Sequence, residues 1–237
     1  MLPPPFDARP PFPGLSDEGL GFLRSLKENN EREWFKPRKA TYDDEVLEPM
    51  RMLVADLSRR LPEAGLPLMG DPKRSVFRIY RDTRFSKNKA PYKTHVAASL
   101  HRGGEKGAPG GLYVHIEPGA SLIGGGFWRP ESKDLRRWRE RMVADPQAFL
   151  DVAEAVRGAG LRFQATGDNL LKRMPRGFQD HADSPVAAFL KWKSGFVAFR
   201  DDVPDAAVQT PAFADLVVET ALSMRPLLEY GWEVLNE

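Results

Sequence analysis

The chain has 237 residues with 35 basic and 33 acidic side chains, which gives a formal net charge of only +2. So small a charge creates no strong global field that would draw the protein to nucleic acid. The sequence contains no cysteine, which excludes disulfides, thiolate metal ligands and a cysteine nucleophile and fits a cytoplasmic location. No apolar run approaches the roughly 20 residues of a membrane-spanning helix, so no membrane association is expected.

The beginning of the chain is rich in proline and lacks the basic segment and apolar run of a signal peptide. We therefore predict a proline-rich N-terminal arm at residues 1–14, followed by one domain over residues 15–237. Because the arm has little periodic apolar content, removal of Met1–Pro10 is expected to leave folding nearly unchanged. Ser16 is expected to cap the first helix, since Asp17 and Glu18 suit its positive end.

The hydrophobic pattern predicts helices, then strands, then helices again. The helices are expected near residues 16–29, 39–61, 131–142, 146–156, 185–193 and 211–235. The strands are expected at Ser75–Arg81, His95–His101, Gly111–Glu117, Ser121–Trp128 and Gly195–Arg200, with a short one in residues 161–178. Pro49 should kink or split the second helix, and Pro226 should bend the last one. This order favours a single α+β domain with a mainly antiparallel central sheet of four to six strands flanked by helices.

The alternation of apolar and polar residues also predicts which strand residues face the core. The expected core residues of these strands are Phe77, Ile79, Leu112, Val114 and Ile116. On the strand that holds the last three, Tyr113, His115 and Glu117 should share the opposite face.

One segment concentrates the positive charge. Residues 73–93 contain eight basic side chains and a single acid, Asp82, so the rest of the chain is net acidic. Basic side chains at this density repel one another unless something negative neutralises them. A basic segment in an otherwise balanced chain favours a local anion site over a general polyanion-binding surface.

The same segment carries a family signature. Arg78, Arg81, Asp82, Arg84, Phe85, Lys89, Pro91 and Tyr92 fill every fixed position of the pattern R-x-x-R-D-x-R-F-x-x-x-K-x-P-Y. The chain thereby resembles a bacterial family known as domain of unknown function 2461. The resemblance extends to Asn30 with Trp34-Phe35 and to residues 113–118. It implies a bacterial source and a chain of about this length, and it supplies no activity, cofactor or catalytic residue.

The chemistry of the segment therefore has to be argued from its residues. Arginine offers a planar fork of donors that matches phosphate or carboxylate oxygens, and lysine adds a mobile point charge. We predict that a small phosphate- or carboxylate-bearing ligand binds here. The predicted ligand-binding residues are Arg78, Arg81, Asp82, Arg84, Lys89, Tyr92, Lys93, His115 and Glu117.

Two other interpretations stay open. The arginines can form a structural ion-pair network, in which Arg81 pairs with Asp82 or Glu117. Alternatively, the basic loop can bind nucleic acid, with Tyr92 and Trp34 as stacking surfaces.

No complete catalytic motif is present, so the sequence leaves the catalytic residues, the reaction and the question of an enzyme open. His115 could act as a general acid or base with Glu117 as its orienting partner. The four histidines are scattered along the chain without a metal-binding spacing. Neither a metal nor a cofactor is therefore expected.

Overall fold

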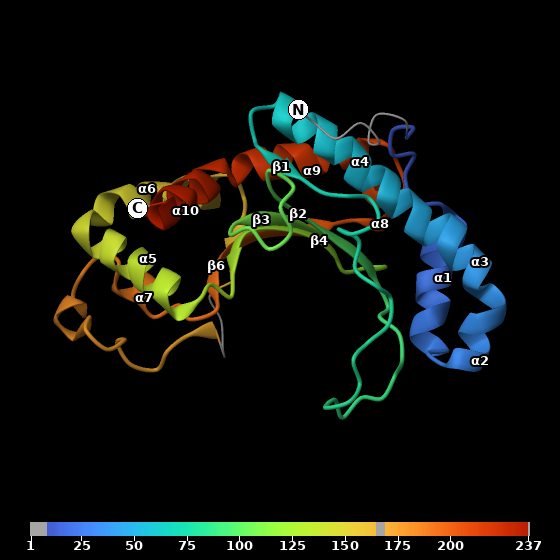
Figure 1. The fold of residues 1–237 in the computed structure, drawn as a ribbon, viewed down its shortest axis with the longest axis horizontal. Helices are drawn as coiled ribbons and strands as arrows, with labels where there is room; N and C mark the ends of the chain where they lie inside the picture. Colours follow the sequence, from blue (N-terminus) through green and yellow to red (C-terminus); the bar gives the residue numbers. More distant parts are fainter. Residues whose placement is uncertain (1–8, 165–168, 237) are drawn as a thin grey trace. The chain divides into compact units, whose positions relative to one another are not determined.

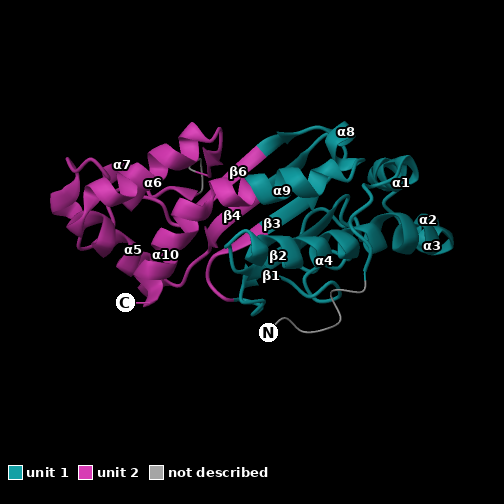
Figure 2. Cartoon of the chain, turned by 90° about the horizontal axis from the view of Figure 1, so that it is seen from above, with its two compact units in different colours: residues 1–107, 113–123, 201–219 teal, residues 108–112, 124–200, 220–237 magenta. Residues whose placement is uncertain are grey.

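The computed structural model describes residues 9–164 and 169–236. The chain divides into two compact units (Figure 2), each built from separate stretches of the sequence. Unit 1 comprises residues 1–107, 113–123 and 201–219, and unit 2 comprises residues 108–112, 124–200 and 220–237. One six-stranded, mainly antiparallel sheet has the strand order β1-β2-β3-β4-β6-β5, and helices pack against it, so the α+β fold is as predicted.

The helices and strands have the following bounds. The α-helices are α1 Asp17–Glu28, α2 Arg32–Phe35, α3 Lys39–Tyr42, α4 Glu48–Glu63, α5 Ser132–Ala144, α6 Pro146–Gly158, α7 Ala187–Leu190, α8 Asp205–Val208, α9 Ala212–Ser223 and α10 Arg225–Asn236. The strands are β1 Leu68–Met69, β2 Val96–Arg102, β3 Gly111–Ile116, β4 Ser121–Trp128, β5 Arg162–Phe163 and β6 Gly195–Val203.

The first helix of unit 1 begins as its sequence predicts. The Ser16 hydroxyl accepts a hydrogen bond from the backbone N–H of Gly19 at 3.0 Å, which satisfies one of the free donors at the helix start. Leu20, Leu23 and Leu26 form the buried face of α1. The helix ends at Asn29, whose backbone N–H still bonds to the carbonyl of Ser25.

The second predicted helix stays helical throughout, but its α-helical turns are interrupted before Pro49. A π-helical turn over Asp43–Leu47 separates α3 from α4, and Pro49 lies in the first turn of α4. Proline has no N–H to donate to the preceding turn, so it is tolerated at this position. α4 then packs along β1 and β2 (Figure 1).

The strand register predicted for β3 is confirmed. Leu112, Val114 and Ile116 are buried, whereas Tyr113, His115 and Glu117 are only half-buried. The second set therefore occupies the opposite face of the strand from the core. This half-buried face carries the polar groups described below.

The prediction for Ser75–Arg81 is wrong in two respects. The segment forms isolated bridges, Val76 with Ala98 and Tyr80 with Tyr92, instead of a regular strand. Phe77 is 42% exposed, although Ile79 is buried as expected. Because Val76 faces the core, its neighbour Phe77 takes the opposite face, where its ring lies 6.0 Å from that of Tyr113.

The pairing partner of this segment is irregular as well. The N–H of Phe77 donates to the carbonyl of Ala97 at 2.8 Å, and the N–H of Lys93 donates to that of Ile79 at 2.7 Å. Between these two hydrogen bonds the first segment has one residue, Arg78, whereas the segment paired with it has three, residues 94–96. Extra residues of this kind bend one chain and re-aim its side chains.

Unit 2 is held together by aromatic rings and one buried guanidinium. Trp138 stacks on Phe196 with centroids 4.2 Å apart. Its neighbour Arg139 is buried and donates to the carbonyls of Leu190 at 2.8 Å and Trp192 at 3.0 Å. The basic run of α5 is therefore not only a solvated face, because Arg139 ties α5 to the segment that follows α7.

Among the described residues, no helix is long and apolar enough to cross a membrane.

Part of the predicted arm is docked in unit 1. Phe12 is buried and its ring lies 6.0 Å from that of Phe213 in α9. Arg9 pairs with Glu48 of α4. The proposed truncation of Met1–Pro10 falls mostly outside the described residues.

We predict that Phe12→Ala lowers the free energy of unfolding by about 3–5 kcal/mol, since it leaves a cavity where a buried ring was. Urea denaturation of the wild type and the variant would measure this loss. Pro11→Ala, at an exposed neighbouring position, should change stability by less than about 0.5 kcal/mol. Equal stabilities of Phe12→Ala and the wild type would show that the arm contributes nothing to unit 1.

Candidate functional site

The basic loop of residues 81–91 is anchored by the side chain of Asn30. The amide nitrogen of Asn30 donates to the carbonyl of Tyr92, and its amide oxygen accepts from the N–H of Tyr92, both at 3.0 Å. The Tyr92 ring stacks on Phe35 of α2 with centroids 4.2 Å apart. The end of the loop is therefore fixed to the helical segment that follows α1.

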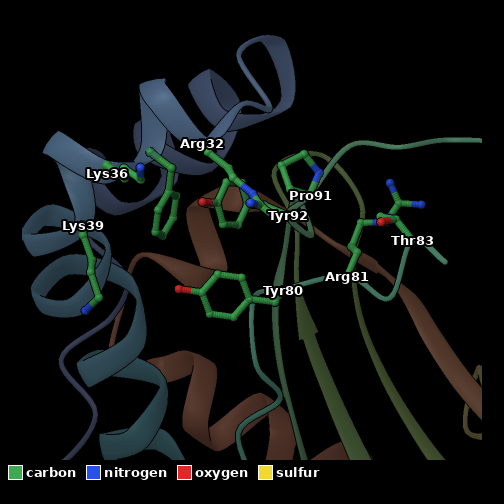
Figure 3. Close-up of a pocket in the computed structure, with 9 residues that line it drawn as sticks. Arg32, Lys36, Lys39, Tyr80, Arg81, Thr83, Pro91 and Tyr92 are labelled. Carbon is green, nitrogen blue, oxygen red and sulfur yellow. The ribbon is translucent and has the colours of Figure 1, made fainter.

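A cavity of about 400 Å³ lies beside this anchor, between the loop and the helices. Its lining residues are Arg32, Phe35, Lys36, Lys39, Tyr80, Arg81, Thr83, Pro91 and Tyr92. Figure 3 shows that Tyr80 and Tyr92 extend their hydroxyl ends toward the helical side, which carries Lys36 and Lys39, whereas Arg81 and Thr83 lie on the loop side. The cavity thus combines aromatic walls with basic groups from two parts of the chain.

The lining contains four basic side chains and no acid. Arg32, Lys36 and Lys39 lie at spacings of four and three residues on consecutive helical turns, so they share one face. None of the three was predicted from the sequence, although their spacing is a signal that could have identified them. Lys39 pairs with Asp43. None of the described acids forms an ion pair with Arg32, Lys36 or Arg81.

Of the predicted ligand-binding residues, Arg81 and Tyr92 line the cavity. Arg81 is half-buried and its Nη1 donates to the carbonyl of Ala90 at 3.2 Å, whereas Asp82 pairs with Arg84. Tyr92 is only 4% exposed. Burial raises the pKa of the Tyr92 hydroxyl, which therefore stays neutral near neutral pH.

The tip of the loop is arranged differently. Nε and Nη2 of Arg84 donate hydrogen bonds to the carboxylate of Asp82, at 3.0 and 2.7 Å. These hydrogen bonds lower the pKa of Asp82. The bidentate fork of Arg84 is thus already occupied. Lys89 donates to the carbonyl of Thr83 at 3.0 Å, which closes the loop. Phe85 at the tip is 94% exposed.

Lys93 and Arg78 lie outside the cavity lining. The ammonium of Lys93 lies over the ring of Phe77, 5.4 Å from its centroid. Burial and the neighbouring guanidinium of Arg78 lower the pKa of Lys93. The predicted set therefore separates into a cavity group, a loop-tip group and a group near the face of β3.

The face of β3 carries a continuous chain of hydrogen-bonding groups. The Tyr113 hydroxyl lies 2.9 Å from Nδ1 of His115, and Nε2 of His115 lies 3.3 Å from Oε2 of Glu117. The Thr94 hydroxyl donates to Oε1 of the same carboxylate at 2.8 Å. His115 and Glu117 are thus brought together as predicted, and Tyr113 and Thr94 complete the chain.

His95 joins this group, which the sequence analysis did not anticipate. Its ring packs on that of His115 with centroids 4.0 Å apart. Burial and the neighbouring His115 lower the pKa of His95 to about 4, and burial also lowers that of His115. Burial alone would raise the pKa of Glu117, but the hydrogen bonds from Thr94 and His115 lower it. Near neutral pH the two imidazoles are therefore neutral and the carboxylate is charged.

The chain matches the family of conserved hypothetical proteins DUF2461 over residues 18–230, which include the cavity and the β3 face. The protein belongs to this family. A search of curated proteins and a search of solved structures gave no significant match.

We predict that Asn30→Ala lowers the free energy of unfolding by about 1–3 kcal/mol, because it leaves the Tyr92 N–H and carbonyl without their partner. Chemical denaturation would measure the loss. The matched variant Asn29→Ala removes an exposed amide and should cost less. Equal losses in the two variants would contradict an anchoring role for Asn30.

The lowered pKa of His95 predicts a pH dependence of stability. Between its folded pKa of about 4 and the ordinary value of 6.5, the unfolded chain binds more protons than the folded chain. The contribution of His95 to the free energy of unfolding is therefore present above pH 6.5 and decreases as the pH falls toward 4. His95→Gln should flatten this part of the profile, measured by urea denaturation in the presence of EDTA. Parallel profiles of wild type and variant would refute the assignment.

Proposed function

We propose that the protein binds a small phosphate- or carboxylate-bearing molecule in the cavity between the basic loop and helices α2 and α3. The observation that carries this proposal is the cavity lining itself, with four basic side chains, three aromatic rings and no acid. A cavity of this size lies in the range typical of small-molecule sites.

The charge balance of the cavity supports an anionic ligand. Like charges gathered at one surface repel one another, and an anion bound among them relieves this repulsion. Each charge-assisted hydrogen bond to such a ligand is stronger than a neutral one. The exposed ring of Tyr80 can contact a flat or apolar part of the same ligand.

Nucleic-acid binding by the basic loop is the alternative, and it requires exposed aromatic surfaces. Tyr92 is buried against Phe35 and cannot offer a free ring face, which disfavours the predicted stacking role. Tyr80 and Phe85, 57% and 94% exposed, are the rings that remain accessible near the loop. We favour the small-molecule proposal because the basic groups from α2 and α3 meet the loop around a cavity. We further propose that the protein is bacterial and is located in the cytoplasm.

We predict that inorganic phosphate, a nucleoside monophosphate or a dicarboxylate binds the wild-type protein with one site per chain, as measured by isothermal titration calorimetry. Lys36→Gln and Arg32→Gln should each raise the Kd by roughly 10- to 100-fold, since one charge-assisted hydrogen bond contributes about 1.5–3 kcal/mol.

Lys87→Gln is the matched control. It removes the same charge from an exposed position of the basic loop outside the cavity lining, so the Kd should stay within about threefold of the wild-type value. The proposal fails if no anion of the panel binds, or if the control weakens binding as much as the cavity variants. Binding of an oligonucleotide with no small anion bound would instead favour the alternative.

A further inference from the structure

We propose that His95, His115 and Glu117 form a binding site for a divalent transition-metal ion of the Zn²⁺ class. A nitrogen of each imidazole and a carboxylate oxygen of Glu117 lie within 4.8 Å of one another. The irregular pairing of residues 94–96 brings His95 beside β3, which supplies the other two groups. This site is separate from the anion cavity, because none of the three residues lines that cavity.

One donor–donor distance in this group already matches a metal site. Zinc binds nitrogen at about 2.0–2.1 Å and oxygen at about 2.0–2.2 Å in tetrahedral sites, so neighbouring ligand atoms lie about 3.3 Å apart. Nε2 of His115 and Oε2 of Glu117 are separated by 3.3 Å. This distance is long for a hydrogen bond between nitrogen and oxygen, and it matches one edge of the tetrahedron.

Two of the ligands also have the outer partners that metal ligands usually have. The Tyr113 hydroxyl lies beside Nδ1 of His115, so a metal on Nε2 leaves Nδ1–H to donate to that hydroxyl. The Thr94 hydroxyl holds Oε1 of Glu117, which leaves Oε2 to face the imidazoles. Each ligand is therefore oriented through the atom that the metal does not use.

Two ammonium groups lie near the proposed site: Lys93 is one of the groups that lower the pKa of His95, and Lys27 lies near Glu117. Lys27 approaches Glu117 to 4.0 Å, but it does so at Oε1, and its side chain is largely exposed. Solvent screens such an exposed ammonium. Two imidazoles and one carboxylate provide three ligands, which leaves a fourth position for water or an anion, as in catalytic zinc sites. This proposal replaces the expectation of no metal, which rested on the scattered positions of the histidines in the sequence.

The test uses the full chain, stripped with EDTA and titrated with Zn²⁺ in competition with a chromophoric chelator. We expect one equivalent to bind. Loss of an outer-shell partner alone costs 10- to 100-fold in affinity, so His95→Ala, His115→Ala and Glu117→Gln should each weaken binding by at least about 100-fold. His101→Ala removes a histidine of β2 that lies outside this group and should leave the affinity within about threefold of the wild type.

Circular dichroism would verify that each variant is folded. Substitution of the wild-type protein with Co²⁺ gives a second measurement that does not depend on any variant. An intense visible absorption, typical of four-coordinate Co²⁺, is expected. The proposal is overturned if the folded wild type binds no Zn²⁺, if the ligand variants bind as tightly as His101→Ala, or if Co²⁺ gives only the weak spectrum of the hydrated ion. Phosphate titration of the metal-free protein tests the anion cavity separately.

Discussion

The arrangement of the candidate sites depends on the double hydrogen bond between the Asn30 side chain and the Tyr92 backbone. An amide side chain that donates one hydrogen bond to the backbone of a residue and accepts another from it pairs with that residue as a neighbouring β-strand would. Here it joins positions 62 residues apart in the sequence. It holds Tyr92 against Phe35, and this contact closes one wall of the cavity. Since Tyr92 ends the basic loop, the same interaction also determines where the chain turns back toward β2.

Beyond Tyr92 the chain departs from regular β-pairing, and this departure places His95 beside His115. Thr94 and His95 belong to the stretch that bulges opposite Arg78, so their side chains reach the half-buried face of β3. A regular strand would have continued the alternation from Tyr92 into β2 without extra residues. The basic cavity and the imidazole–carboxylate group therefore both depend on one short segment. Tyr92, before the bulge, lines the cavity, and His95, within the bulge, packs on His115.

The local features of the fold could be predicted because they rest on local physics. The cap at Ser16, the bounds of β4 and the face shared by His115 and Glu117 follow from side-chain chemistry and periodicity alone. The exposure of Phe77 could not be predicted, because it depends on pairing with a distant and irregular stretch. For the same reason His95 was not expected beside His115.

The candidate site was foreseen only in part. The excess of positive charge in residues 73–93 pointed to the loop as a whole. It did not distinguish Arg81, which lines the cavity, from Arg84, whose guanidinium pairs with Asp82. Arg32, Lys36 and Lys39 lie far from the signature in sequence, and they join Arg81 only through the tertiary structure. A concentration of charge in the sequence can suggest an anion site, but the tertiary structure determines which side chains line it.

The interleaving of the two units along the chain has a consequence for biosynthesis. Residues 201–219 belong to unit 1, whose first stretch ends at residue 107, and all of residues 124–200 lie between them. During translation, the ribosome must therefore make most of unit 2 before unit 1 can be completed. Neither unit corresponds to a continuous gene segment, so the protein cannot fold one finished unit after another as it emerges. Long-range closure of this kind slows folding and leaves incomplete surfaces exposed for longer, which increases the dependence of the nascent chain on chaperones.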